Sequence, residues 1–276
     1  MRINRFSLKN RVYVITGGAG LIGKKHASAV LEGDGIPVLL DIFEPSLNKA
    51  KEELLLRYPE ATIETFVVDI SNRDELCIVE NEILNRYGHI DGLINNAANN
   101  PKVEGGSTNL AATKFVDFPV DVWNADLLVG LTGAMLCSQV FGSQMEKQGK
   151  GVIINIGSDY GIIAPDQRVY RKKGIPEDEQ IVKPVSYSVV KHGIMGLTKY
   201  LAAYWGKVGI RVNTLCPASL YNGQDEEFVK KISNLIPMGR MSDPEEYVGT
   251  IQYMLSDASS YMTGATVLLD GGRTII

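Results

Sequence analysis

The chain has 276 residues, of which 45% are hydrophobic and 22% charged, and its formal net charge is -4. This is the composition of an ordinary globular protein, and the mildly acidic balance argues against nucleic-acid binding. The apolar runs are of strand length, so we expect no membrane span. The three cysteines, Cys77, Cys137 and Cys216, are widely spaced. They predict reduced thiols, a cytoplasmic location and no metal site.

Short β-branched runs alternate with helical patterns along the chain. Strands are predicted at 11–16, 36–42, 62–70, 90–98, 151–158, 210–217 and 265–272, and helices at 21–32, 45–58, 72–88, 121–148, 185–209 and 243–257. Strands buried on both faces and separated by helices imply a parallel sheet, and right-handed crossovers make it doubly wound. We therefore predict an α/β fold: one Rossmann-type domain over residues 1–276 with helices on both faces. Residues 99–119 and 162–184 look like insertions in this frame.

The segment TGGAGLIG (16–23) lies between the first predicted strand and the first predicted helix. Gly17, Gly20 and Gly23 form a variant of the dinucleotide-binding fingerprint. In this reading Gly17 allows the tight turn, Gly20 lets the backbone approach a pyrophosphate, and Gly23 lets the helix pack closely. The N-terminal N–H groups and the dipole of the helix favour phosphate.

Asp41 ends the second predicted strand, 18 residues after Gly23. A carboxylate at about 20 residues from the glycines accepts hydrogen bonds from the adenosine ribose and repels a 2′-phosphate. The sequence therefore favours NAD over NADP as the cofactor.

Six motifs then occur in order: TGGAGLIG (16–23), Asp69–Ile70, NNAA (95–98), Ser158 after the fifth strand, YSVVK (187–191) and DGG (270–272). Together they resemble the short-chain dehydrogenase/reductase family over nearly the whole chain. The resemblance implies an NAD(P)-dependent oxidoreductase that forms a homodimer or homotetramer through its two long helices. It also implies a set of cofactor contacts: Gly17, Gly20, Leu21, Ile22, Gly23, Asp41, Asp69, Ile70, Asn95, Ala97, Ala98, Tyr187, Lys191, Pro217 and Ala218.

Tyr187 and Lys191 are four residues apart on a predicted helix and so share a face. A free phenol titrates at about 10. A neighbouring ammonium and an oxidised nicotinamide are expected to lower that pKa, so that Tyr187 exchanges a proton with the substrate near neutral pH. By the resemblance, Lys191 also holds the nicotinamide ribose, and Ser158 hydrogen-bonds the substrate oxygen.

The sequence departs from the family pattern at three places. Gly130 stands where the family usually has an asparagine that holds a proton-relay water; a carbonyl group in a loosened helix turn is one substitute. Pro217–Ala218 replaces the usual Pro-Gly, and the threonine that often follows is missing, which leaves Ser219 or Asn222 for its role.

The third departure is the spacing of 29 residues between Ser158 and Tyr187, about twice that of the family. The additional residues form the predicted substrate loop, 162–184. It carries the cationic residues Arg168, Arg171, Lys172 and Lys173, which suit an anionic substrate, although a solvated or oligomer-contact loop is an equal alternative.

The C-terminal tail and the long insertion are similar to members associated with bacterial surface-sugar synthesis, including flagellin-glycan and lipopolysaccharide modification. We therefore expect hydride transfer to or from a hydroxyl or keto group of a sugar, either nucleotide-linked or acidic. One alternative is a generic 3-oxoacyl or secondary-alcohol reductase. An alternative of another class is a non-catalytic NAD-responsive binding protein.

Overall fold

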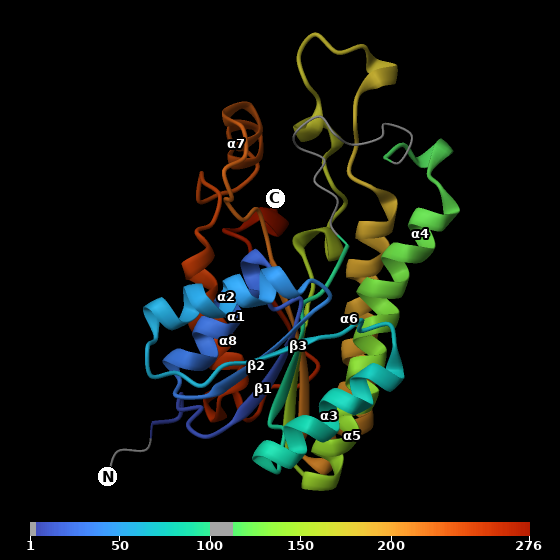
Figure 1. The fold of residues 1–276 in the computed structure, drawn as a ribbon. Helices are drawn as coiled ribbons and strands as arrows, with labels where there is room; N and C mark the ends of the chain where they lie inside the picture. Colours follow the sequence, from blue (N-terminus) through green and yellow to red (C-terminus); the bar gives the residue numbers. More distant parts are fainter. Residues whose placement is uncertain (1–3, 100–112) are drawn as a thin grey trace.

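The computed structural model describes residues 4–99 and 113–276, which contain a seven-stranded sheet of parallel pairs (Figure 1). The spatial order is β3-β2-β1-β4-β5-β6-β7. The strands are β1 (Val12–Thr16), β2 (Ile36–Asp41), β3 (Glu64–Val67), β4 (Gly92–Asn95), β5 (Gly151–Ile156), β6 (Ile210–Pro217) and β7 (Thr266–Leu269). Each predicted strand is present, but β3, β4 and β7 are shorter than predicted.

Helices cover both faces of the sheet, as predicted (Figure 1). One face carries α1 (Leu21–Glu32), α2 (Glu44–Arg57) and α8 (Val248–Leu255), and the other carries α3 (Arg73–Tyr87), α5 (Ala134–Gln148) and α6 (Val185–Trp205). Each layer has its own apolar core, with side chains such as Leu39 and Ile251 on the first face and Phe141 and Val212 on the second. This confirms the doubly wound fold class.

The local sequence determines where several helices begin and end. The Asn72 side chain caps α3 by accepting hydrogen bonds from the N–H groups of Asp74 and Glu75, at 3.1 and 3.4 Å. Gly88 ends the same helix at φ 77°, a left-handed conformation that glycine adopts without strain. The stretch predicted as one helix at 243–257 instead begins with the short 3-10 helix η8 (Pro244–Tyr247), which precedes α8.

The helix predicted at 121–148 is continuous but not uniform. It consists of α4 (Val120–Leu127), a π-helical segment η3 (Leu128–Gly133) and α5. By length and composition alone, Val120–Gln148 is apolar enough to cross a bilayer, which corrects our expectation that apolar segments are only of strand length. Half of its most apolar window is buried, and α5 packs on β4, β5 and α3 as a core helix.

A third apolar cluster lies above the carboxyl ends of the strands. There the 3-10 helix η5 (Gln167–Tyr170) of the 162–184 segment packs against α7 (Glu226–Ser233), a helix that the sequence patterns did not predict. Tyr170 and Ile232 are among its buried members. Most of the other proposed insertion, 100–112 of 99–119, lies outside the described residues.

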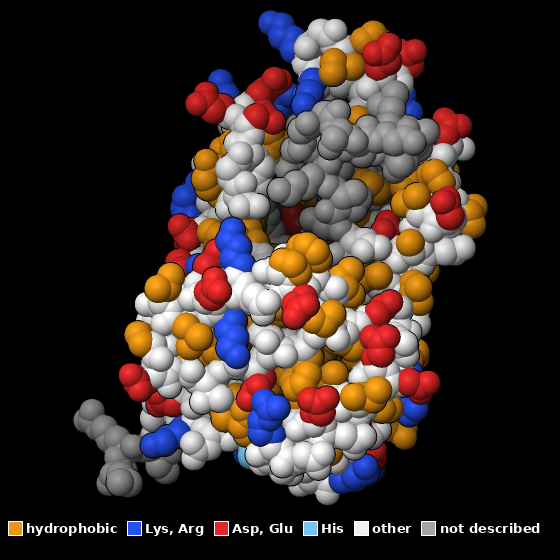
Figure 2. Space-filling model, in the orientation of Figure 1, with side chains coloured by type: hydrophobic (Ala, Val, Ile, Leu, Met, Phe, Trp, Pro, Cys, Tyr) orange, Lys and Arg blue, Asp and Glu red, His pale blue; other side chains and the backbone are white. Residues whose placement is uncertain are grey.

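Acidic and basic side chains are interspersed over the face of the molecule shown in Figure 2. Many charged side chains of the molecule are paired: Arg57 bonds Glu32 and Glu245, and Arg240 bonds Glu246. Exposed pairs of this kind contribute about 0–1 kcal/mol each, so the surface charges are not what holds the fold together.

Candidate active site

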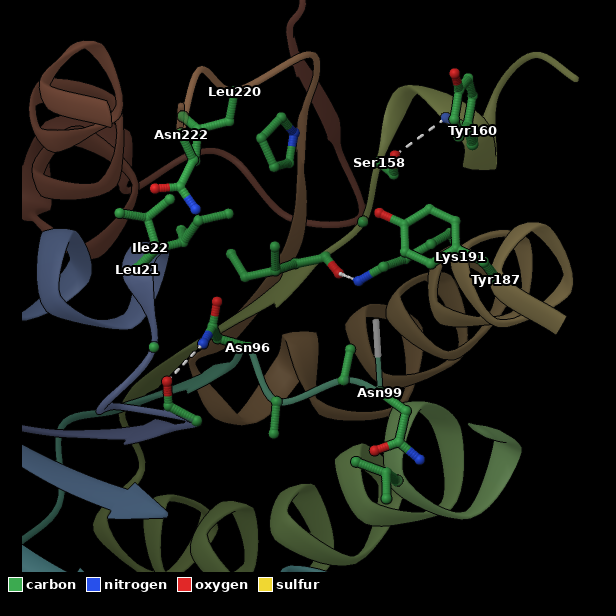
Figure 3. Close-up of a pocket in the computed structure, with 18 of the residues that line it drawn as sticks. Leu21, Ile22, Asn96, Asn99, Ser158, Tyr160, Tyr187, Lys191, Leu220 and Asn222 are labelled. Atoms are coloured by element: carbon green, nitrogen blue, oxygen red, sulfur yellow. Dashed lines mark hydrogen bonds between the residues drawn. The ribbon is translucent and has the colours of Figure 1, made fainter. Parts of the chain in front are cut away.

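A cavity of about 790 Å³ lies at the carboxyl ends of the strands, with lining residues from the β1 and β4 ends. Strand order reverses between these two neighbours, and ligands of open α/β sheets bind at such a point. Most of the residues proposed from the sequence line this cavity (Figure 3). They are Gly17, Gly20, Leu21, Ile22, Asp41, Asp69, Ile70, Ala97, Ala98, Ser158, Tyr187, Lys191, Pro217 and Ala218.

The glycine turn forms one end of the cavity. Gly17 has φ 61°, and a Cβ there would stand 3.0 Å from the Cα of Ala97. Gly20 precedes α1, and within the described residues no side chain caps that helix start or places an acid in its first turn. The N–H groups of the turn therefore have room for an anionic ligand. Gly23 does not line the cavity: a Cβ on it would overlap the carbonyl oxygen of Gly17, so it sets the packing of α1 on the turn.

Two acidic side chains stand beside that end. Asp41 closes β2, and its carboxylate accepts hydrogen bonds from the N–H groups of Ile42 at 2.9 Å and Ala19 at 3.3 Å. These bonds hold the carboxylate against the glycine turn. Asp69 follows β3 and accepts from the N–H and the hydroxyl of Ser71. Ile70, next to it, is buried beneath the helix segment at Gly133.

Asn95 does not line the cavity, whereas its neighbour Asn96 does. The Asn95 amide lies in a buried polar cluster and donates to Asn155 Oδ1 at 2.8 Å and Ser138 Oγ at 3.1 Å. Asn96 Nδ2 donates to the carbonyl oxygens of Thr16 and Gly17 at 2.9 and 3.1 Å (Figure 3). Asn95 therefore joins β4 to its neighbours, and Asn96 holds the glycine turn.

Ser158, Tyr187 and Lys191 converge on the middle of the cavity. Figure 3 shows the phenol oxygen of Tyr187 directed towards Ser158. Lys191 is buried and donates from Nζ to the carbonyl oxygen of Ile156 at 2.7 Å, while the same Nζ lies 5.7 Å from the centre of the Tyr187 ring. The helical spacing thus brings phenol and ammonium together as expected.

The pKa of Tyr187 differs from the expectation. Burial raises it to about 12, and the hydrogen bond with Ser158 lowers it only in part. Burial also lowers the pKa of Lys191 to about 8. The ammonium is directed to a backbone carbonyl rather than to the phenol oxygen, so in this structure it does not make Tyr187 acidic. Tyr187 holds its proton at neutral pH.

The helix at Gly130 is loosened, as expected, because Gly130 lies within the π-helical segment η3. A Cβ on Gly130 would stand 2.5 Å from Cγ1 of Val190, one residue before Lys191. An ordinary van der Waals contact between two carbon atoms is about 1 Å longer than this distance. The close approach of α6 therefore leaves no room for a side chain at this position.

The cations that we expected the 162–184 segment to supply do not line the cavity. Arg168 pairs with Asp166 at 2.7 Å, and Arg171 pairs with Glu177 at 2.5 Å. The segment instead contributes Tyr170 and Lys183. Lys183 Nζ lies 4.0 Å above the centre of the Tyr187 ring, a cation–π contact.

The loop after β6 forms the remaining wall. It lines the cavity with Pro217, Ala218, Ser219 and Asn222. Both candidates for the role of the missing threonine, Ser219 and Asn222, therefore face the cavity. The amide of Asn222 lies on the side of the glycine turn in Figure 3. Apolar side chains of α7, Phe228 and Ile232, complete this side.

The polar residues of the cavity that were not predicted include Asn96, Asp159 and Lys183. Asn96 was part of the NNAA motif, and Asp159 directly follows Ser158, so adjacency was an available signal for both. Lys183 is four residues before Tyr187, but Pro184 separates it from the helix. Within residues 4–99 and 113–276, no group of three His, Cys, Asp or Glu side chains is placed to hold a metal ion.

Comparison with known proteins agrees with this geometry. The family described as short chain dehydrogenase matches residues 11–170, and the one described as Enoyl-(Acyl carrier protein) reductase matches residues 177–274. The NAD-dependent glycerol dehydrogenase of Listeria innocua is 32% identical over 278 residues, covering 98% of this chain and 96% of that protein.

Two further proteins are similar to this chain over nearly its whole length. The post-translational flagellin modification protein A of Campylobacter coli is 30% identical over 265 residues, covering 96% of this chain and 98% of that protein. A crystal structure of gluconate 5-dehydrogenase from Burkholderia cenocepacia, in complex with NADP and tartrate, superposes with a TM-score of 0.82 at 26% identity. The match covers 99% of this chain and 98% of that one.

Proposed function

The chain belongs to the short-chain dehydrogenase family, and we propose that it is an NAD-dependent oxidoreductase that interconverts a hydroxyl and a keto group of a sugar, polyol or acidic sugar derivative. The observation that carries this proposal is the convergence of Ser158, Tyr187 and Lys191 on a cavity whose other end is the glycine turn. A polyol dehydrogenase and a sugar-acid dehydrogenase among the similar proteins support the substrate class.

The residues present fit a dinucleotide. Gly17 and Gly20 leave space where a side chain would stand, the first turn of α1 is uncapped by side chains among the described residues, and Asp41 is fixed beside it. These groups would hold the pyrophosphate and the adenosine ribose, and Lys191 would hold the nicotinamide ribose. When bound, the nicotinamide would exchange a hydride with the substrate carbon. The related proteins use NAD or NADP, and the Asp41 carboxylate supports NAD here.

The side chains of this chain supply the proton chemistry. With a pKa of about 12, Tyr187 carries the proton that a reduced carbonyl oxygen must receive. Ser158, at 4% exposure, has its hydroxyl held beside the phenol and can bind the same substrate oxygen. Lys191 keeps its charge at neutral pH, since its pKa is about 8. Its position is fixed by the Ile156 carbonyl.

An acidic substrate is the finer part of the proposal. The ammonium groups of Lys183 and Lys191 lie 4.0 and 5.7 Å from the centre of the Tyr187 ring, so a carboxylate on a substrate bound at the phenol would lie close to two positive charges. Lys183→Met is expected to raise KM for sugar acids about tenfold, the effect of losing one partly buried charge contact, with little change for an uncharged polyol. Lys173→Met, at an exposed residue of the same segment, is the matched control. Equal KM changes on both substrate types would refute this assignment.

The decisive experiment compares NADH turnover on three panels: nucleotide-linked keto sugars, keto acids and ketoses, and acyl ketones. Tyr187→Phe is expected to remove most of the activity while NADH binding is retained, and Tyr200→Phe, at an exposed position of the same helix, is the control. Activity on acyl ketones alone would favour the alternative 3-oxoacyl reductase. NADH binding with no turnover on any panel would favour the non-catalytic alternative.

Assembly and location belong to the same proposal. Apolar surface is exposed on η3 and α6, at Leu128, Val189, Tyr200 and Tyr204. This surface supports a homodimer or homotetramer built on these helical segments. Light scattering of Tyr200→Asp against the wild type tests this, because a charge at the interface should lower the mass. The remaining part of the proposal is a cytoplasmic role in surface-sugar synthesis. The similarity to a protein named for flagellin modification supports only the link to a surface structure.

A further inference from the structure

Asp159 places a carboxylate directly behind the Ser158 hydroxyl. Ser158 Oγ donates to Asp159 Oδ1 at 2.8 Å, both residues are only 4% exposed, and both line the cavity. The two residues stand in the turn that follows β5, where Ser158 precedes the short helix η4 (Asp159–Gly161). A buried acid therefore lies one hydroxyl group away from the reacting phenol.

The direction of these hydrogen bonds gives the arrangement its chemistry. A serine hydroxyl has one proton to donate and two lone pairs that accept. Ser158 gives its proton to Asp159 and accepts from the N–H of Tyr160 at 3.2 Å (Figure 3). Its second lone pair is left for the Tyr187 hydroxyl once the substrate oxygen has left, because the phenol oxygen is directed towards Ser158 (Figure 3). The order is phenol, hydroxyl, carboxylate.

The ammonium groups beside Tyr187 are less suited to accept its proton. Lys191 donates to the carbonyl oxygen of Ile156, and Lys183 lies over the face of the ring. Both are donors when charged. Of the side chains of Ser158, Lys183 and Lys191, only Ser158 therefore offers an acceptor to a proton that leaves the phenol.

We propose that Asp159 is a positioning residue that accepts, through the Ser158 hydroxyl, the proton that Tyr187 gains when an alcohol is oxidised. This rests on the proposed function of the site. In the step, the Tyr187 O–H bond breaks as a new O–H bond forms on Ser158, and the former Ser158 proton binds the Asp159 carboxylate. The products are a phenolate, a neutral serine and a neutral carboxylic acid. The reverse transfer returns Tyr187 to its acid form for reduction.

The surroundings of Asp159 suit a carboxylate that changes charge. Burial raises its pKa, while the hydrogen bonds from Ser158 and from the Tyr160 N–H lower it. Arg273, itself buried, lowers it further, and Asp270 raises it. The titratable groups that face it are Tyr160 in its own turn, Tyr187 on α6, Cys216 on β6, Tyr247 on η8, and Asp270 and Arg273 after β7.

Asp159 also has a structural contact, because Oδ1 accepts from the Tyr160 N–H at 3.0 Å. An asparagine keeps an acceptor at that position and removes the charge and the proton-binding site. Asp159→Asn therefore separates the two roles. Asp243→Asn is the matched control: Asp243 caps η8 by the same kind of bond, to the Glu245 N–H at 2.8 Å, and is exposed outside the cavity.

The first readout needs no cofactor. Alkaline titration of tyrosinate absorbance, taken as the difference from Tyr187→Phe, reports the ionisation of Tyr187. Since the Asp159 charge raises the Tyr187 pKa, the midpoint is expected to move to lower pH in Asp159→Asn and to stay unchanged in Asp243→Asn. Asp159→Ser is a second uncharged variant and is expected to behave as Asp159→Asn does.

The second readout is the pH profile of alcohol oxidation. Asp159→Asn is expected to lower kcat about 10- to 100-fold, the low end of general acid–base effects, to remove one ionisation from the profile, and to recover part of the rate with added acetate. The proposal would be overturned if Asp159→Asn and Asp159→Ser both kept the wild-type pH profile of oxidation and the wild-type midpoint of the Tyr187 titration. If the wild type oxidises no substrate, the proposed function fails, and the titration still decides the proton chain.

Discussion

A side chain introduced at Gly130 tests the packing that places the catalytic helix. An alanine Cβ there would stand 2.5 Å from Val190 Cγ1, about 1 Å closer than ordinary contact. Valine in a helix has one strongly preferred rotamer, so Val190 cannot turn away cheaply. Overpacking costs about 1–3 kcal/mol, against a gain of up to about 1 kcal/mol for replacing glycine in a helix. Gly130→Ala should therefore destabilise the protein by about 0–2 kcal/mol.

A double-mutant cycle with Val190→Ala gives this prediction its test. Removing the clashing methyl groups should turn Gly130→Ala from destabilising to neutral or stabilising, a coupling of about 1–3 kcal/mol in the free energy of unfolding measured by denaturant. Gly196→Ala is the control, because a Cβ at that position of α6 meets nothing within 4 Å. Its effect should be the same in the wild type and in the Val190→Ala variant.

The result that would refute the reasoning is an equal effect of Gly130→Ala in the wild-type and Val190→Ala backgrounds. The same contact makes a functional prediction. An asparagine at 130 must displace α6 near Lys191, so Gly130→Asn is expected to lower NADH turnover, although asparagine is the usual residue of the family. Higher turnover of Gly130→Asn would mean that α6 yields without affecting the site.

Three further changes follow from the structure. His26 is fully buried, and burial lowers its pKa from 6.5 to about 3. Between pH 7 and pH 5 the imidazole therefore takes up a proton in the unfolded chain but not in the folded protein, so the wild type should lose about 2 kcal/mol of stability over this range. Unfolding curves of His26→Leu should show that this loss is removed. Gly23→Ala would overlap the Gly17 carbonyl, so calorimetry should show NADH affinity at least about tenfold weaker; unchanged affinity would contradict the assigned packing. Asp41→Asn keeps one of the two acceptor oxygens that hold this side chain but removes the charge that repels a 2′-phosphate. It should shift the kcat/KM ratio of NADH to NADPH at least about tenfold towards NADPH; a constant ratio would argue against the NAD assignment.

Much of this molecule was determined by short-range patterns in the sequence. The bounds of α1, Leu21–Glu32, are those predicted, because a glycine turn and a glycine end mark the helix directly in the chain. The alternation of buried strands and helices was sufficient for the doubly wound sheet, since only one handedness of crossover is common. The helical repeat alone placed Tyr187 and Lys191 on one face.

Other features were decided by contacts between residues far apart in sequence. Whether Asn95 or Asn96 faces the cavity depends on the buried amide of Asn155, and the absence of a side chain at Gly130 depends on Val190 of another helix. The 162–184 segment brings Lys183 to the phenol and not the predicted Arg168 or Arg171, because ion pairs within the segment take up these two arginines. The raised pKa of Tyr187 likewise reflects burial, which only the packed structure defines. Periodicity determines which residues share a face, but the partner across that face, and hence the charge and solvation of each group, is determined by packing.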